Sequence, residues 1–192
     1  MITSESILKT LEDKGYLLKK ENNYPNLVGI RKALNNDNLF NDVLYLFIWK
    51  NNQQSLTVFN YPITTDPGRW YLNHPINKNG CAIVKEGAYK NLWTIGKHQG
   101  KYTALVQIGK IKVYRDINKD NVMDFKEDTL QEGYFGVNLH HAGVNSNTVD
   151  NWSAGCQVFK NIKDFDEVMR YVTTSKYSFF NYYLLNEKDI NS

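Results

Sequence analysis

Short β-rich segments separated by turns are the feature that most constrains the fold of this chain. Two apolar runs, "VLYLFIW" and "SLTVFNYPI", flank the polar stretch "KNNQQ", which has the length and polarity of a hairpin loop. Further short runs are separated by turns that contain glycine or asparagine: "CAIV", "YTALVQI", "KIKVYRD", "YFGVNLHH" and, last, "YSFFNYYLL". This pattern favours a mixed sheet or sandwich over a helix bundle.

Two segments have helical periodicity instead. Near the N-terminus, "SESILKTLEDKGY" places three apolar side chains on one stripe and ends at Gly15, which can adopt the left-handed conformation of a helix cap. A second helix is predicted over residues 161–172, where Asn161 and Asp164 form a cap-like pair. Its apolar face consists of Phe165, Val168, Met169 and Val172.

Length and composition limit the number of domains. With 192 residues and 42% hydrophobic content, the chain can bury one sizeable core but hardly two. We therefore expect a helical extension over residues 1–40 and one β-rich domain over residues 41–192.

Charge and cysteine content limit the partners and the location. A net charge of +3 is too small, and too evenly spread, to predict nucleic acid binding. No stretch approaches the roughly 20 apolar residues of a membrane span. The start, "MITSESILKT", lacks the order of a secretory signal. We therefore expect synthesis in the cytoplasm, where the chain either stays or leaves by another route such as lysis, to act at the cell wall. Two cysteines, Cys81 and Cys156, are too few for a disulfide scaffold and are expected to be thiols.

A candidate nucleophile and its base occur in the stretch "HHAGVNSNTVDNWSAGCQVF". The adjacent His140 and His141 precede Cys156, and the loop between them is rich in glycine, asparagine and serine, so it can fold back and bring two strands together. An imidazole beside a thiol can take its proton and so produce the reactive thiolate. The alternative is a buried, unreactive thiol.

The segments "VNLHHAG" and "WSAGCQVF", followed by an amphipathic helix, resemble the catalytic segment of the L,D-transpeptidases, the YkuD-like fold. This resemblance implies a β-rich sandwich with a helix after the catalytic cysteine, and an active site for peptidoglycan stem peptides. It makes Cys156 the nucleophile, His140 the general base and His141 a residue that helps to orient the base. From about residue 24 onward, the chain is also similar to phage- and prophage-type members.

The residues around the cysteine agree with the family pattern in part. Ser153 and Gly155 match the serine and glycine before the nucleophile, and the amides of this stretch are candidates for binding an oxyanion. Ala154, however, stands where the family usually has a second histidine. Gln157-Val158 replaces an apolar residue followed by asparagine or arginine. Because of these departures, the family pattern does not determine which substrate or which acceptor the site would use.

Three residues elsewhere are candidates for substrate binding: Arg115, His98 and Tyr134. The planar fork of Arg115 suits a peptide carboxylate, and a surface salt bridge is the alternative. His98 lies between glycines and can reach a groove, or it can be a hydrogen-bonded structural histidine. Cys81 is expected to be buried and inert.

The stretch "DINKDNVMDFKE" has the spacing of a loop that binds calcium. Oxygen-bearing side chains occupy positions 1, 3, 5, 9 and 12 of twelve: Asp116, Asn118, Asp120, Asp124 and Glu127. Asn121 replaces the usual glycine and can mimic it, because asparagine tolerates the left-handed conformation. A strand rather than a helix precedes the stretch, so a solvated acidic loop is the alternative.

These features together predict cysteine-dependent acyl transfer on peptidoglycan stem peptides. We expect a monomer that needs no cofactor, apart from the calcium that the acidic loop can hold. Transfer to an amine would make a cross-link, and transfer to water would make the protein a peptidase. Other interpretations are a phage endolysin-type peptidase, a catalytically silent cell-wall-binding or virion structural protein, and a cytoplasmic cysteine hydrolase.

Overall fold

The computed structural model describes residues 2–32, 38–144 and 146–190. Within these ranges, the longer strands are β1 (Asn26–Arg31), β2 (Asp42–Lys50), β3 (Ser55–Thr64), β5 (Gly87–His98), β6 (Tyr102–Gln107), β7 (Ile111–Asp116) and β11 (Phe180–Asn186). The shorter ones are β4 (Cys81–Val84), β8 (Gln131–Gly133), β9 (Leu139–His141) and β10 (Gln157–Phe159). The helices are α1 (Ser4–Asp13), α2 (Arg69–Asn73) and α3 (Ile162–Thr174), with 3-10 turns η1 (Glu127–Thr129) and η2 (Glu187–Asp189).

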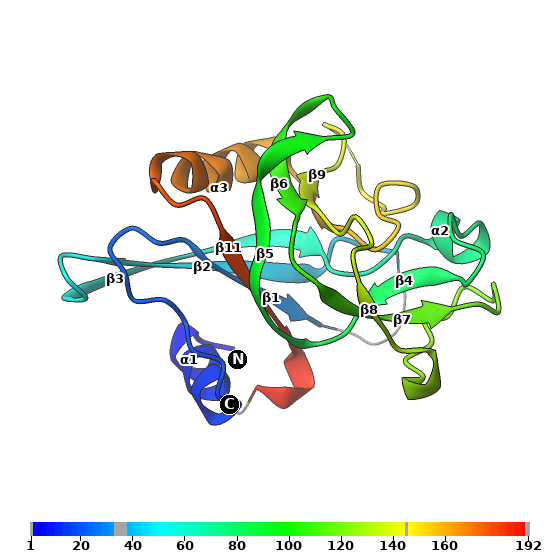
Figure 1. Cartoon of the computed structure of the whole chain (residues 1–192), viewed down its shortest axis with the longest axis horizontal. Helices are drawn as coiled ribbons and strands as arrows, with labels where there is room; N and C mark the ends of the chain where they lie inside the picture. Colours follow the sequence, from blue (N-terminus) through cyan, green and yellow to red (C-terminus); the bar gives the residue numbers. More distant parts are fainter. Residues whose placement is uncertain (1, 33–37, 145, 191–192) are drawn as a thin grey trace.

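Eight of these described strands form a closed barrel in the order β1-β11-β5-β6-β9-β10-β3-β2, and β4-β7-β8 form a separate sheet (Figure 1). The mainly β class with a few helices is therefore confirmed. The sandwich that the resemblance implied is not, because the main sheet closes on itself. Closure depends on the parallel pairing of β1 with β11, which joins the two ends of the chain.

Several local predictions agree with the structure. The hairpin is formed by β2 and β3, with Lys50 opposite Ser55 at its tip. Gly15 ends the first helix with a φ of 70°. The predicted apolar face of α3 is buried throughout. The run "YFGVNLHH", by contrast, is a strand only over its last three residues, and β5 was not identified as a strand.

The strands near the chain ends are buried on both faces. Alternate residues point to opposite sides of a strand, so Leu27 and Tyr182 pack in the barrel core, whereas Val28 and Tyr183 pack outside it. The outer cluster is completed by α1, which covers this side of the barrel (Figure 1). β1 is thus one of the barrel strands, because it pairs with β11 and β2. The boundary expected at residue 40 would instead place β1 in the N-terminal extension.

One barrel residue reaches from β11 to the strand that follows the cysteine. The hydroxyl of Tyr182 donates a hydrogen bond to the Oε1 of Gln157, and both side chains are fully buried. A Cβ at Gly29 would lie 2.1 Å from that hydroxyl, so only glycine leaves room for it. The start of β10 is therefore held from inside the barrel.

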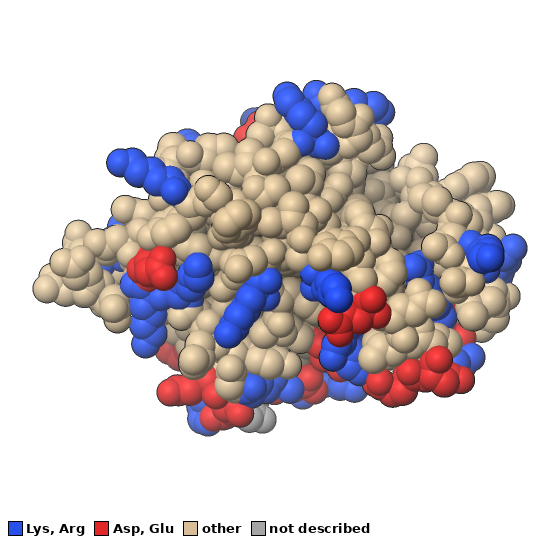
Figure 2. Space-filling model, in the orientation of Figure 1, with Lys and Arg blue, Asp and Glu red and all other residues tan. Residues whose placement is uncertain are grey.

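The surface carries charges of both signs. Figure 2 shows basic side chains scattered over one face, with acidic side chains among them along its lower edge. This face therefore has no continuous basic surface. Within the described ranges, no helix combines the length and the apolar character needed to cross a membrane.

Candidate active site

The parallel pairing of β9 with β10 brings the candidate base and nucleophile to one place. Val158 lies opposite His140, and Cys156 immediately precedes β10. The backbone N–H of Asn138 donates to the Sγ of Cys156 at 3.5 Å, and this thiol donates to the carbonyl of Gly136 at 3.4 Å. Cys156 and His140 line the same cavity, which has a volume of about 230 Å³.

Hydrogen bonding determines the tautomer of His140. Its Nδ1 lies 3.0 Å from the carbonyl oxygen of His141. A carbonyl can only accept, so Nδ1 carries the proton and Nε2 keeps a free lone pair. The hydroxyl of Tyr102 donates to the same carbonyl at 3.4 Å. His140 thus has the unprotonated nitrogen that a general base requires.

His98, predicted to contact substrate, lines the cysteine cavity and stacks on the candidate base. The ring centroids of His98 and His140 are 4.0 Å apart, with an interplanar angle of 17°. Asn138 orients His98: its Oδ1 accepts from the Gln107 N–H at 3.0 Å, so its Nδ2 donates to the Nδ1 of His98 at 3.1 Å. Asn138 was missed in the sequence, although it lies only two residues before His140, just ahead of β9.

Loss of hydration keeps the candidate pair neutral, although Cys156 itself is only half-buried. Loss of hydration raises the pKa of the Cys156 thiol to about 11, and the hydrogen bond from Asn138 opposes this only in part. Loss of hydration, followed by the neighbouring His98, lowers the pKa of His140 to about 3. At neutral pH the cavity therefore holds a thiol and an uncharged imidazole, not an ion pair. Proton transfer must then accompany attack on a substrate.

The "SAGC" loop is held in a conformation that needs glycine. Ser153 donates from Oγ to the carbonyl of Cys156 at 2.8 Å and accepts from the Gly155 N–H at 3.2 Å. Gly155 has a φ of 120°, and a Cβ there would lie 2.6 Å from the Ala82 carbonyl oxygen. Within the described residues, the N–H groups of Ala154 and Cys156 have no hydrogen-bond acceptor, so they are the amides available to an oxyanion.

Among the described residues, no hydrogen bond or ring stacking joins the ring of His141 to that of His140. Its Nδ1 lies 2.7 Å from the carbonyl of Ala142, and the ring packs against Tyr102 and Phe165, with centroids 4.3 and 5.0 Å away. It lines a neighbouring cavity of about 340 Å³ but not the cysteine cavity. Only the backbone carbonyl of His141 contacts the base.

Arg115 is buried, and its side-chain hydrogen bonds go to neutral groups of the described residues. It is 5% exposed, its Nε donates to the Oε1 of Gln131 at 3.0 Å, and its Nη1 donates to the Gly80 carbonyl at 3.2 Å. The guanidinium lies 4.8 Å from the ring centroid of Phe135. No ion pair involves Arg115 within the described part of the chain. A buried charge with only neutral partners is costly, and an anionic ligand would offset that cost.

The cavity that Arg115 lines adjoins the cysteine cavity. It has a volume of about 270 Å³, and Tyr134, the third predicted substrate contact, lies at its edge with 65% exposure. The two cavities share three lining residues: Ile76, Phe135 and Ala154. A ligand that extends past Ala154 would therefore reach from the thiol to the guanidinium.

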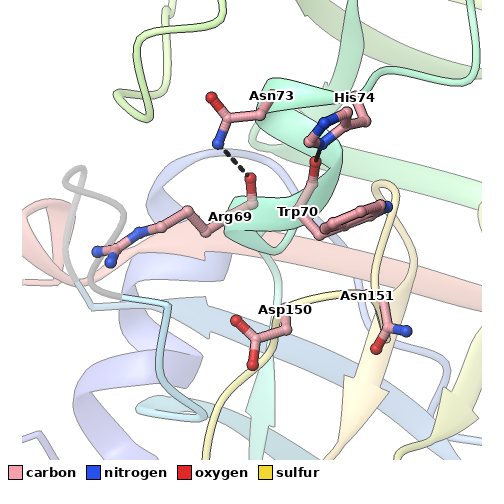
Figure 3. A pocket seen from close by; sticks show the side chains of 6 residues that line it. All are labelled: Arg69, Trp70, Asn73, His74, Asp150 and Asn151. Carbon is pink, nitrogen blue, oxygen red and sulfur yellow. Dashed lines mark hydrogen bonds between the residues drawn. The ribbon is translucent and has the colours of Figure 1, made fainter.

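A further cavity next to this site is not lined by the cysteine. It measures about 450 Å³ and is lined by Arg69, Trp70, Asn73, His74, Asp150 and Asn151 (Figure 3). The ring of His74 stacks on that of Trp70 at 4.2 Å. Asn151 also lines the cysteine cavity, so the two spaces meet at this residue.

The remaining candidates do not line the cysteine cavity, although Cys81 lines the adjoining Arg115 cavity. Cys81 is 3% exposed, and burial raises the pKa of its thiol to about 12, in keeping with an inert cysteine. Glu127, the last residue of the predicted calcium loop, pairs instead with Lys85 and the Tyr114 hydroxyl. Among the described residues, no group of three or more His, Cys, Asp and Glu side chains is arranged to hold a metal as they stand.

No protein-family model, curated protein or solved structure matches the chain.

Proposed function

We propose that this protein is a cysteine-dependent acyltransferase of the L,D-transpeptidase type that acts on the peptide stems of peptidoglycan. The observation that carries the proposal is the shared cavity of Cys156 and His140, with Nε2 of the imidazole unprotonated. The motif resemblance supports the class of substrate. Arg115 supports the choice of a peptide with a free carboxylate, because its charge is buried in the cavity that adjoins the cysteine cavity and forms no ion pair with the described acidic residues.

The proposed reaction begins with attack of the Cys156 sulfur on a peptide carbonyl. His140 takes the thiol proton on Nε2 as the C–S bond forms, and the amides of Ala154 and Cys156 stabilise the oxyanion. When the C–N bond breaks, His140 returns this proton to the leaving amine. A thioester remains on Cys156. An amine or a water molecule, deprotonated by His140, then attacks the thioester carbonyl. The C–S bond breaks, and His140 returns the proton to the departing Cys156 sulfur.

Water is proposed to resolve the thioester at least as often as an amine. Ala154 provides no polar side chain for holding an acceptor, and the cavities around the cysteine meet at Asn151 and Trp152. Water needs no binding site to compete, whereas an amine must be positioned. We therefore expect more hydrolysed than cross-linked product when a donor tetrapeptide and an amine acceptor are supplied together.

The test is incubation with purified muropeptides and analysis of the products by mass spectrometry. The proposal predicts products from the wild type and from Cys81→Ala but none from Cys156→Ala, with circular dichroism confirming that all three are folded. Products that persist in Cys156→Ala would reject the nucleophile. A ratio of cross-linked to hydrolysed product well above one would reject only the preference for water.

A further inference from the structure

The loop between β7 and η1 carries several carboxylates, and one of them is buried at its start. Asp116 is the last residue of β7 and is 1% exposed. Its Oδ2 accepts from the N–H of Asp124 at 3.2 Å, but its Oδ1 is buried and has no hydrogen-bond partner among the described residues. A buried carboxylate oxygen without a donor is costly, and such an oxygen needs either a proton or a cation.

The other loop carboxylates converge on donors that act as substitutes for a cation. The Nδ2 of Asn118 lies 3.0 Å from Oδ2 of Asp120 and 3.1 Å from Oδ2 of Asp124. The ammonium of Lys126 lies 2.7 Å from that same Asp124 oxygen. These positively polarised hydrogens occupy the space between the acids. Rotation of the Asn118 amide would turn its carbonyl oxygen toward the acids in place of its NH₂ group.

The backbone of the loop has the turn that a calcium loop requires. Asn121, at the position where such loops usually have glycine, adopts a φ of 67°. The N–H of Val122 donates to Oδ1 of Asp120 at 2.8 Å, which draws the chain around the acids. Val122 is the residue that would contribute its backbone carbonyl to the ion.

We propose that this loop binds one calcium ion through the side chains of Asp116, Asn118, Asp120 and Asp124 and the backbone carbonyl of Val122. Glu127 is not part of the site, because it is paired with Lys85 and Tyr114, so solvent completes the coordination. The buried Oδ1 of Asp116, which has no hydrogen-bond partner among the described residues, is one of the proposed ligands. Calcium displaces Lys126 from Asp124 and rotates the Asn118 amide. This proposal does not depend on the proposed function.

The experiment is calcium titration of the full chain after treatment with EDTA, followed by calorimetry and by thermal unfolding. One ion should bind per chain. The melting temperature should rise by about 5 to 10 °C when calcium is present at roughly a hundred times its dissociation constant. Absence of bound calcium at about 10 mM, or an unchanged melting temperature, would overturn the proposal.

Two variants test the ligands, and a third is the control. Asp120→Asn, at an exposed position, should weaken calcium binding about tenfold or more, because charge in the ligand set determines affinity. Asp116→Asn should weaken it as much while raising the melting temperature in EDTA, since it removes the buried unpaired carboxylate. Asp128→Asn removes the same charge just outside the loop and should bind calcium as the wild type does. Equal calcium affinity in all four proteins would overturn the proposed ligands.

Discussion

His98 and His140 stack face to face, with ring centroids 4.0 Å apart and an interplanar angle of 17°. The stack is buried, since His98 is 8% and His140 3% exposed. A positive charge on either ring would lie against the other without solvent to screen it. This contact, together with burial, explains why the cavity holds an uncharged imidazole.

The neutral state of His140 predicts a loss of stability in acid. An unfolded histidine has a pKa near 6.5, whereas burial lowers the pKa of His140 in the folded protein to about 3. Between these values the unfolded chain binds a proton that the folded chain does not, so the free energy of unfolding falls as the pH falls. For one such group, the free energy of unfolding falls by about 2 to 3 kcal/mol when the pH is lowered from 6.5 to 4.5.

Urea denaturation at about pH 6.5 and pH 4.5 measures this effect. His140→Asn should lose less stability on acidification than the wild type does. His74→Asn is the matched control, because that histidine is exposed, and it should behave as the wild type. An equal loss in His140→Asn and the wild type would show that the ring is not held neutral.

The two adjacent histidines should differ in their effect on catalysis. His140→Gln should lower kcat/KM by about 10² to 10⁴, the usual contribution of a general base. His141→Gln should stay within about tenfold of the wild type, because only the backbone carbonyl of His141 contacts the base, and glutamine keeps that carbonyl. Steady-state rates on one peptide substrate give the comparison. Equal losses in both variants would contradict the assigned base.

The turn before the cysteine should not tolerate a side chain. Gly155→Ala is expected to destabilise the fold by more than about 2 kcal/mol, since strain from its φ adds to the clash with the Ala82 carbonyl. Gly100→Ala is the control, because Gly100 has a φ of 73° but no atom within 4 Å of the added Cβ. It should cost about 1 kcal/mol. If thermal unfolding gives the same loss for both, the close approach to Ala82 is unimportant.

Arg115 should discriminate between peptides by their carboxylates. In a Cys156→Ala background, a stem tetrapeptide with a free C-terminus should bind about 10 to 100 times more tightly than its C-terminal amide, the range for a hydrogen bond to a charged group. Adding Arg115→Gln should abolish the difference. Calorimetry measures both affinities without turnover. If Arg115→Gln still prefers the free C-terminus to the amide, a group other than Arg115 binds the carboxylate.

The parts of the fold that sequence patterns predicted are those with local causes. The buried stripe of α3, the left-handed Gly15 and the polar tip of the β2–β3 hairpin each depend on residues close together in the chain. Barrel closure was not predictable, because it requires β1 to pair with β11 at the other end of the chain. No pattern within either strand distinguishes a closed sheet from a sandwich.

In the candidate site too, features with local causes were predictable and features that depend on distant residues were not. The nearness of Cys156 and His140 could be predicted because one short segment contains both, and β9 and β10 then pair directly. The stacking of His98, and the lack of an ion pair between Arg115 and any described acidic residue, are tertiary facts that neither residue's neighbours in the sequence reveal. The left-handed conformation of Asn121, by contrast, could be predicted from its position in the acidic loop.

The most direct test of the central claim is capture of the thioester on Cys156. The protein is mixed with a stem tetrapeptide, quenched in acid within the first turnover and examined by intact-protein and peptide mass spectrometry. The account predicts an acyl adduct that maps to Cys156, forms equally in Cys81→Ala and is released by hydroxylamine. An adduct on Cys81, or product formed by Cys156→Ala at the wild-type rate, would contradict it.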